Sequence, residues 1–235
     1  MRVIGSLPPP SQEAHARARI WAASALAALA VLMAMLLIGA PPQGAGPAAA
    51  GLRLSRIDSF DRDLGACRAA LAGAGFATEA LPDLREGGCG YRNAVELTQS
   101  VHAYSAPVAT RCAMAAALAL WERDVVAPAA RRHFGQDVAR IELAGPSYAC
   151  RPVAGTNRLS EHARANAMDI GGFLLADGRR ISVERGWRGQ RAERAFLRAV
   201  RDGACAHFDA VLSPDYNRAH RDHLHFDRGP NQMCR

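Results

Sequence analysis

The chain has 235 residues, enough for one well-buried domain plus a tail. All 29 of its basic residues are arginine, and a sequence without lysine excludes Schiff-base and Ser-Lys chemistry. The formal net charge is +7 at pH 7, a balance that suits an anionic polymer. No basic run is interleaved with aromatic residues, so a nucleic-acid partner is not expected.

The first predicted element is an apolar helix at residues 20–40. These 21 residues carry no charge, and at 1.5 Å rise per residue they would span the ~30 Å hydrocarbon core of a bilayer. Three arginines and one glutamate precede them, so the positive-inside rule places residues 1–19 in the cytoplasm and exports the remainder. The sequence therefore predicts a single-pass membrane protein.

A cleaved signal peptide is the alternative, because Ala48-Ala49-Ala50 could serve a signal peptidase. The apolar stretch is longer than the usual signal h-region of about 7 to 15 residues, which favours a transmembrane anchor or an uncleaved signal. A linker rich in proline, glycine and alanine follows at 41–56, and the folded domain is expected at 57–235.

Helical patterns dominate the first part of the domain. Residues 58–75 are predicted to form a helix that ends at glycines. The stretch 78–106 has few apolar residues and is expected to be irregular and held by a disulfide. A second helix, capped by Thr110, should continue until Pro128 interrupts or kinks it and Gly135 ends the element.

The rest of the domain is expected to be mainly strands. Alternating patterns and turn signals predict them at 139–143, 147–151, 168–175, 180–183, 210–212 and 223–226. The second strand should pair with the first, and Asp177-Gly178 should turn a hairpin between the third and the fourth. A helix is expected at 193–200, ended by Gly203. Because no βαβ unit repeats, we predict an α+β fold with a mostly antiparallel sheet and flanking helices.

The six cysteines form an even set in a chain predicted to be exported, which fits up to three disulfides in an oxidising compartment. None lies in a CxxC pair, which argues against a zinc ribbon or a thioredoxin-like site. Proximity in the sequence favours three pairs, although fifteen pairings are possible: Cys67 with Cys89, Cys112 with Cys150, and Cys205 with Cys234.

Two separated histidine clusters predict a catalytic zinc site. The ligands would be His162, Asp169 and His225, since zinc enzymes commonly use three His or carboxylate ligands and keep a fourth position for a water, whose pKa falls to about 7. Two neutral imidazoles and one carboxylate partly neutralise one ion while leaving it a strong Lewis acid.

Hydrolysis also needs a base and a positive charge near the developing oxyanion. His223 is the first candidate for the substrate-facing role, because on a strand it would share a face with His225, two residues later. Asp222 is a second candidate for the base, although on a regular strand it would point away from both histidines. His220 and Ser160 are expected beside the ligands, where His220 could orient a ligand or a water.

These segments resemble the extensin-like C-terminal domain of bacterial proteins, over about residues 67–234. The resemblance rests on four motifs: Tyr148-Ala149-Cys150-Arg151, Arg158-Leu159-Ser160-Glu161-His162-Ala163, Pro214-Asp215-Tyr216-Asn217 and His220-Arg221-Asp222-His223-Leu224-His225. The same residues are similar to the zinc D-Ala-D-Ala carboxypeptidases and murein endopeptidases, whose signature is S-x-H-x-x-G-x-A-x-D followed by H-x-H. The matching positions are Ser160, His162, Ala167, Asp169, His223 and His225.

The resemblance implies a D-Ala-D-Ala metallopeptidase-like fold and zinc bound by the first His, the Asp and the last His. It also implies a substrate-contacting arginine, a role that would fall on Arg151. The chain departs from the signature at Ala165, where a glycine is expected, so a backbone that needs positive φ there would be strained.

The expected function is that of a membrane-anchored zinc hydrolase of peptidoglycan stem peptides, either a carboxypeptidase or an endopeptidase. It would be anchored in the bacterial inner membrane, with the domain periplasmic or extracellular. The alternative is a non-catalytic cell-wall-binding module that retained the fold, favoured by Ala165 and by the lack of a glutamate base. A third possibility is a metal-dependent hydrolase that acts on another substrate.

Overall fold

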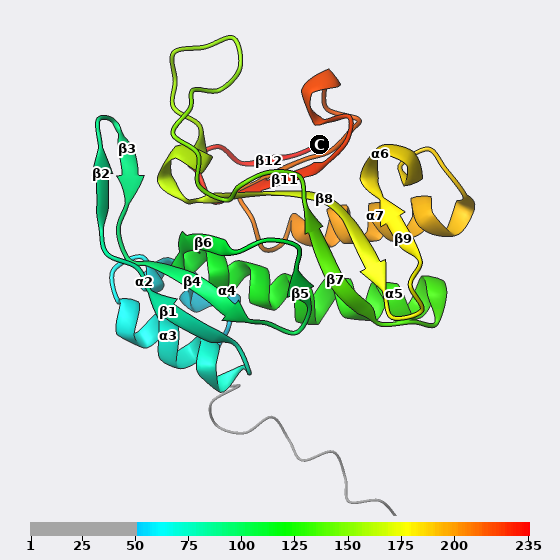
Figure 1. Ribbon diagram of the computed structural model, residues 1–235, viewed down its shortest axis with the longest axis horizontal. Helices are drawn as coiled ribbons and strands as arrows, with labels where there is room; N and C mark the ends of the chain where they lie inside the picture. Colours follow the sequence, from blue (N-terminus) through cyan, green and yellow to red (C-terminus); the bar gives the residue numbers. More distant parts are fainter. Residues whose placement is uncertain (1–50) are drawn as a thin grey trace, which may run out of the picture. The chain divides into compact units, whose positions relative to one another are not determined.

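A seven-stranded sheet forms the centre of the structure, which is a computed structural model that describes residues 51–235 (Figure 1). Its strands lie in the order β12 (Met233–Cys234), β10 (Ala210–Leu212), β11 (Leu224–Asp227), β8 (Ala167–Leu175), β7 (Val138–Leu143) and β5 (Ala103–Tyr104), with β9 (Arg180–Ser182) also paired to β8. The β12–β10 and β5–β7 pairs are parallel, and the other pairs are antiparallel. The predicted α+β class with a mostly antiparallel sheet is confirmed.

Two smaller sheets occupy the stretch that was expected to be irregular. They are a three-stranded sheet of β1 (Ala77–Ala80), β4 (Ala94–Gln99) and β6 (Val108–Arg111), and a hairpin of β2 (Leu84–Glu86) and β3 (Cys89–Tyr91). The expectation of irregular structure was wrong because these strands are short and several have no apolar face. In the hairpin, only Cys89 is buried, so no alternation marks its strands.

Helices α2 (Ile57–Phe60) and α3 (Leu64–Gly73) replace the single helix predicted at 58–75. The break has a local cause, because Asp63 is the N-cap of α3 and its side chain accepts a hydrogen bond from the Ala66 amide at 2.8 Å. The cap allows the chain to start a new helix within three residues of the first.

The second predicted helix is α4 (Cys112–Trp121), and every residue of it is buried. Thr110 does not cap it: Thr110 belongs to β6, and the N-cap residue, Arg111, makes no side-chain cap. A π-helical turn, η3 (Glu122–Val126), follows before Pro128 and leads into α5 (Ala127–Phe134). Proline lacks an amide hydrogen, and a π turn is one way for a helix to accommodate the missing bond.

The other helices within residues 51–235 are η2 (Leu54–Arg56), η4 (Glu161–Arg164), α6 (Val183–Gly186), α7 (Arg191–Ala204) and η5 (Arg218–His220). Gly135 ends α5 with φ 64, as its position predicted. Helix α7 covers the helix expected at 193–200, but it continues through Gly203 to Ala204, so the predicted end at Gly203 was wrong. The Asp177-Gly178 hairpin joins β8 to β9 with Gly178 at φ 86. The signals at Gly135 and Gly178 were sufficient because each is a turn residue with a positive φ.

The core lies between the seven-stranded sheet and the helices. Trp121 at the end of α4 contacts Phe226 of β11 and Phe173 of β8, with ring centroids 5.1 and 6.3 Å apart. In β11 the core residues Leu224 and Phe226 alternate with His225 and Asp227, and in β8 the core residues Met168 and Ile170 flank Asp169. One face of this part of the sheet therefore packs on the core, and the other face carries the polar side chains. Loops 152–160 and 213–222 rise on the side away from α4 and α5 (Figure 1).

Two strand assignments differ from the prediction. Residues 147–151 form no strand, and β7 pairs instead with β8 and β5. Strand β11 begins at Leu224, so His223 precedes the strand and does not lie on its face. Both differences arise where a turn residue, proline or aspartate, interrupts an alternating pattern that was otherwise typical of a strand.

The three disulfides are Cys67–Cys112, Cys89–Cys150 and Cys205–Cys234. The Cys205–Cys234 prediction is confirmed, whereas the pairs Cys67 with Cys89 and Cys112 with Cys150 were wrong. Proximity along the chain fails here because α3 packs against α4 and the β2–β3 hairpin extends away from both. Disulfides join cysteines that the fold brings within about 7 Å, whatever their separation in sequence.

The predicted membrane helix at 20–40 lies outside the described residues. Across residues 51–235, no helix combines the length and the apolar character needed to cross a bilayer. Leu52 is already part of the hydrophobic core.

Candidate metal centre

Asp169 and His225 are direct cross-strand partners. In the antiparallel β8–β11 pair, His225 is opposite Asp169, Leu224 is opposite Ile170 and Phe226 is opposite Met168. The four apolar residues belong to the core, so the period of two turns both polar side chains to the other face of the sheet. The pairing register therefore brings a carboxylate and an imidazole together from segments 56 residues apart in the sequence.

His162 reaches the same point from the 3-10 turn η4. Ser160 is the N-cap of this turn and accepts a hydrogen bond from the His162 amide at 3.3 Å. The imidazole is buried, and its Nδ1 lies 3.2 Å from the carbonyl oxygen of Ser147. Because a carbonyl only accepts, Nδ1 carries the hydrogen there, which leaves the lone pair of Nε2 directed at Asp169.

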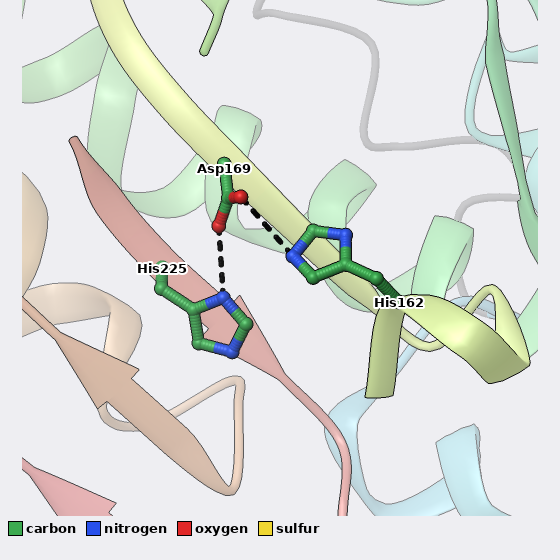
Figure 2. Close-up of side chains that lie close together, drawn as sticks. All are labelled: His162, Asp169 and His225. Atoms are coloured by element: carbon green, nitrogen blue, oxygen red, sulfur yellow. Dashed lines mark hydrogen bonds and ion pairs between the residues drawn. The ribbon is translucent and has the colours of Figure 1, made fainter. Parts of the chain in front are cut away.

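The three predicted ligands converge (Figure 2). His162 Nε2 lies 3.2 Å from Asp169 Oδ2, and His225 Nδ1 lies 2.8 Å from Asp169 Oδ1. One ligand atom from each residue falls within 4.8 Å of the other two. His162 Nε2 is close to the carboxylate, yet it makes no hydrogen bond of acceptable geometry with any described residue. A buried nitrogen without a hydrogen bond, beside a carboxylate and a second imidazole, fits a metal ligand, and this donor set suits Zn²⁺.

The charges at this point are strongly coupled. Burial alone would raise the pKa of Asp169, but the adjacent imidazoles of His162 and His225 outweigh burial and hold that pKa well below its usual range. Burial alone would lower the pKa of His225, but Asp169 and Asp227 raise it to about 9. A carboxylate that stays ionised is a ready ligand for a cation.

Asp227 was not among the predicted site residues. Its Oδ2 lies 2.9 Å from His225 Nε2, and its Oδ1 accepts a hydrogen bond from the Gly229 amide at 2.8 Å. The sequence did hold a signal, because His225 and Asp227 are two residues apart on β11 and so share a face.

His223 and Asp222 form a second Asp-His pair at the edge of the site. His223 Nδ1 lies 2.9 Å from Asp222 Oδ1, and His223 Nε2 lies 3.7 Å from Asp169 Oδ1. Asp222 was expected to point away from His223 on a regular strand. That expectation was wrong because both residues precede β11, in a turn that allows the carboxylate to reach the neighbouring imidazole.

His220 lies beside the three ligands, but its side chain forms its hydrogen bond with Asn217 and not with a ligand. Its Nδ1 is 2.8 Å from Asn217 Oδ1, and its ring centroid is 5.1 Å from that of His223 and 5.9 Å from that of His225. Burial, followed by the nearby His223 and His225, lowers the pKa of His220 to about 4. His220 is therefore neutral near pH 7 and adds an apolar ring edge to this side of the site.

A cleft of about 530 Å³ opens beside the three ligands. Asp169 and His223 line it together with two segments, 144–151 and 219–223, each of which contributes one arginine, Arg151 or Arg221. Arg151 is half exposed, and its guanidinium lies 3.8 Å from Asp169 Oδ2. Asp222 also lines the cleft and pairs with Arg221 at 3.5 Å, and the other lining residues are small or apolar: Ala144, Gly145, Pro146, Ala149 and Ala219.

Comparison with protein families agrees with the motifs that surround this site. The family described as extensin-like protein C-terminus matches residues 65–235, which include all three ligands, His223 and the six cysteines. No curated protein and no solved structure matched the chain, so the similarity to zinc D-Ala-D-Ala peptidases gains no support from these comparisons. The chain belongs to the extensin-like protein C-terminus family.

Proposed function

We propose that this domain is a zinc-dependent hydrolase of peptidoglycan stem peptides. The observation that carries the proposal is the convergence of His162, Asp169 and His225, whose donor atoms lie within 4.8 Å of one another. The orphaned Nε2 of His162 supports a cation at this point in place of a simple hydrogen-bonded cluster. When bound, a zinc ion in such a site supplies Lewis-acid polarisation of a carbonyl and activation of water.

The Asp222–His223 pair supports a proton-transfer role next to the metal ligands. Asp222 accepts the hydrogen of His223 Nδ1, which leaves Nε2 as the basic nitrogen on the side of Asp169. A histidine whose second nitrogen is fixed by a carboxylate can take a proton from water and later give it to the leaving amine. In this proposal Asp222 orients the base and is not the base itself.

The cleft supports a short peptide substrate with carboxylate groups. Arg151 and Arg221 place a positive charge on each of two lining segments, beside Asp169 and Asp222, and the alanines and the glycine let a peptide with small side chains lie close to the wall of the cleft. Stem peptides of peptidoglycan combine small side chains with free carboxylates, so they match both features. Arg151 would also neutralise charge on the reacting carbonyl oxygen, because it lies near Asp169.

The site is proposed to act outside the cytoplasm, on a domain anchored in the bacterial inner membrane. Three disulfides among the six cysteines support an oxidising compartment such as the periplasm. The uncharged stretch at 20–40 supplies the proposed anchor.

A non-catalytic wall-binding module is the second candidate, and Ala165 was the residue that favoured it. Ala165 adopts φ 49 and ψ 38, the left-handed backbone expected of a glycine. The substitution has therefore kept the local backbone that carries His162, and this weakens the case for a module without activity. The lack of a glutamate base still favours it.

Incubation of the zinc-loaded, full-length chain with purified muropeptides tests the proposal. We expect shortened peptides by mass spectrometry from the wild type and none from Asp169→Ala, which loses a metal ligand. Arg221→Gln should cleave with a raised KM, because it keeps the metal and loses a charge in the cleft. If the wild type binds zinc and wall material but leaves every peptide intact, the wall-binding module is the better description.

A further inference from the structure

The imidazole of His225 is held between two carboxylates. Its Nδ1 lies 2.8 Å from Asp169 Oδ1, and its Nε2 lies 2.9 Å from Asp227 Oδ2. His225 and Asp227 alternate with the core residues of β11, so both side chains project from the sheet face that carries the ligands. Each of the three residues is at most 9% exposed, which leaves little water to replace any of these contacts.

The position of Asp227 is itself fixed. Its Oδ1 accepts the Gly229 amide at 2.8 Å, and its backbone pairs with Ala167 of β8 and accepts a hydrogen bond from the Asp209 amide. The carboxylate therefore cannot turn away from the imidazole without losing a backbone hydrogen bond. Asp227 is a rigid acceptor beside a histidine whose orientation it can determine.

An ionised carboxylate accepts hydrogen bonds and donates none. Without a cation, both nitrogens of His225 therefore carry a hydrogen, Nε2 on Asp227 and Nδ1 on Asp169. When a cation binds, Nδ1 is the nitrogen that releases its hydrogen to solvent, because it faces the ligand Asp169, whereas Nε2 keeps its hydrogen on Asp227. Histidine ligands of metal sites commonly donate their other N–H to a carboxylate, and loss of that partner typically costs 10- to 100-fold in metal affinity.

We propose that Asp227 is a positioning residue for the metal centre: it holds His225 in the orientation and tautomer in which Nδ1 binds the ion. This inference rests on the proposed function, because it requires a cation at His162, Asp169 and His225. It assigns a role to a residue outside the three ligands and the cleft.

The Asp222–His223 pair provides a matched control within the same chain. It has the same chemistry and nearly the same length, 2.9 Å, but its histidine is outside the ligand set. Removal of Asp222 should therefore leave zinc affinity unchanged, whereas removal of Asp227 should lower it. A general disturbance of the β11 region would affect both.

The first measurement is zinc affinity by competition with a chromogenic chelator, on full-length chains purified in detergent. We expect Asp227→Ala to bind zinc 10- to 100-fold more weakly than the wild type, and Asp222→Ala to stay within about twofold of it. Asp227→Asn should lie between Asp227→Ala and the wild type, because its amide oxygen can still accept the Nε2 hydrogen. If Asp227→Ala fails to fold, Asp227→Asn against Asp222→Asn gives the same comparison.

The second measurement is the ¹⁵N NMR spectrum of the histidine rings in the zinc-loaded wild type, which needs no variant of Asp227. We expect His225, assigned by its loss in His225→Gln, to show a protonated Nε2 and a metal-bound Nδ1. Zinc on Nε2 of His225 would contradict the inference, as would equal zinc affinities for Asp227→Ala and the wild type. A wild type that binds no zinc at all would refute the proposed function as well.

Discussion

The hydroxyl of Thr110 donates a hydrogen bond to the carbonyl oxygen of Ala165 at 2.8 Å, and so ties β6 to the turn that carries His162. The amide of Arg111 donates to the same oxygen at 2.8 Å. Ala165 is fully buried and has φ 49. Two hydrogen bonds thus hold an alanine in a backbone conformation that costs roughly 1 to 2 kcal/mol for any residue except glycine.

Ala165→Gly should change the free energy of unfolding by less than about 1 kcal/mol. Relief of the left-handed backbone is offset by loss of one buried methyl group, worth about 0.8 kcal/mol. Ala163 is the matched control, because it is equally buried but lies within η4. Ala163→Gly gains no relief and should cost about 1.5 kcal/mol. Urea unfolding of both variants checks this; equal losses would show that Ala165 is not strained.

The Cys89–Cys150 disulfide should support the metal centre from a distance. It ties the β2–β3 hairpin to the segment that contains Ser147, whose carbonyl oxygen fixes His162 Nδ1. Cys89→Ala with Cys150→Ala should therefore lower stability by about 2 to 4 kcal/mol and also weaken zinc binding. The double variant of Cys205 and Cys234 should lower stability without changing zinc affinity, since that bond joins α7 to β12. The zinc affinities of the two double variants, measured by competition with a chelator, check this prediction.

Glu122 should make stability depend on pH. Burial raises the pKa of Glu122 to about 7, against the hydrogen bonds from Tyr104 and His102. The folded state therefore holds the proton more tightly than the unfolded state, and the stabilisation is complete below about pH 4.5 and lost as the pH rises through about 7. Because one pKa unit corresponds to 1.36 kcal/mol, the free energy of unfolding should fall by about 3 kcal/mol over this pH range.

Glu122→Gln should remove this slope, because an amide does not titrate in that range. Glutamine has one acceptor oxygen, so the variant keeps only one of the two hydrogen bonds from His102 and Tyr104 at every pH. The measured quantity is therefore the change of unfolding free energy between pH 4.5 and 7.5, not its absolute value. Glu79→Gln, at an exposed position of β1, is the control. A slope in Glu122→Gln as steep as in the wild type would assign the pH dependence to other groups.

The sequence could predict those parts of the fold whose signal is local. Strand β7 alternates apolar and charged residues, and Asp177-Gly178 needs the positive φ that glycine supplies, so both were predicted. Helix α4 was predicted from its apolar spacing, but the π turn after it was not, because Pro128 indicates a break or a kink in the sequence and not the kind of turn that precedes it. Hairpin β2–β3 was missed because it has no buried face of its own.

The sequence could predict which residues are candidate ligands, but it could not predict the contacts that they make in the folded chain. His162, Asp169 and His225 stand out by residue type and spacing, whereas their approach depends on the register of β8 against β11. Asp227 was missed because a single carboxylate two residues after a histidine is common in strands and on surfaces. Its proposed role rests on the contact with His225 Nε2 and on a burial that the sequence does not display.

His223 and His225 should behave differently when each is replaced. His225→Ala removes a proposed ligand and should lose zinc, whereas His223→Ala should keep zinc and cut muropeptide cleavage roughly 10²- to 10⁴-fold, the usual cost of losing a proton-transfer group. The structure separates them, because His225 Nδ1 lies 2.8 Å from Asp169 Oδ1 and His223 Nε2 lies 3.7 Å from it. Metal content and turnover of both variants check this. Release of zinc from His223→Ala as readily as from His225→Ala would mean that both histidines bind the ion, or that their roles are reversed.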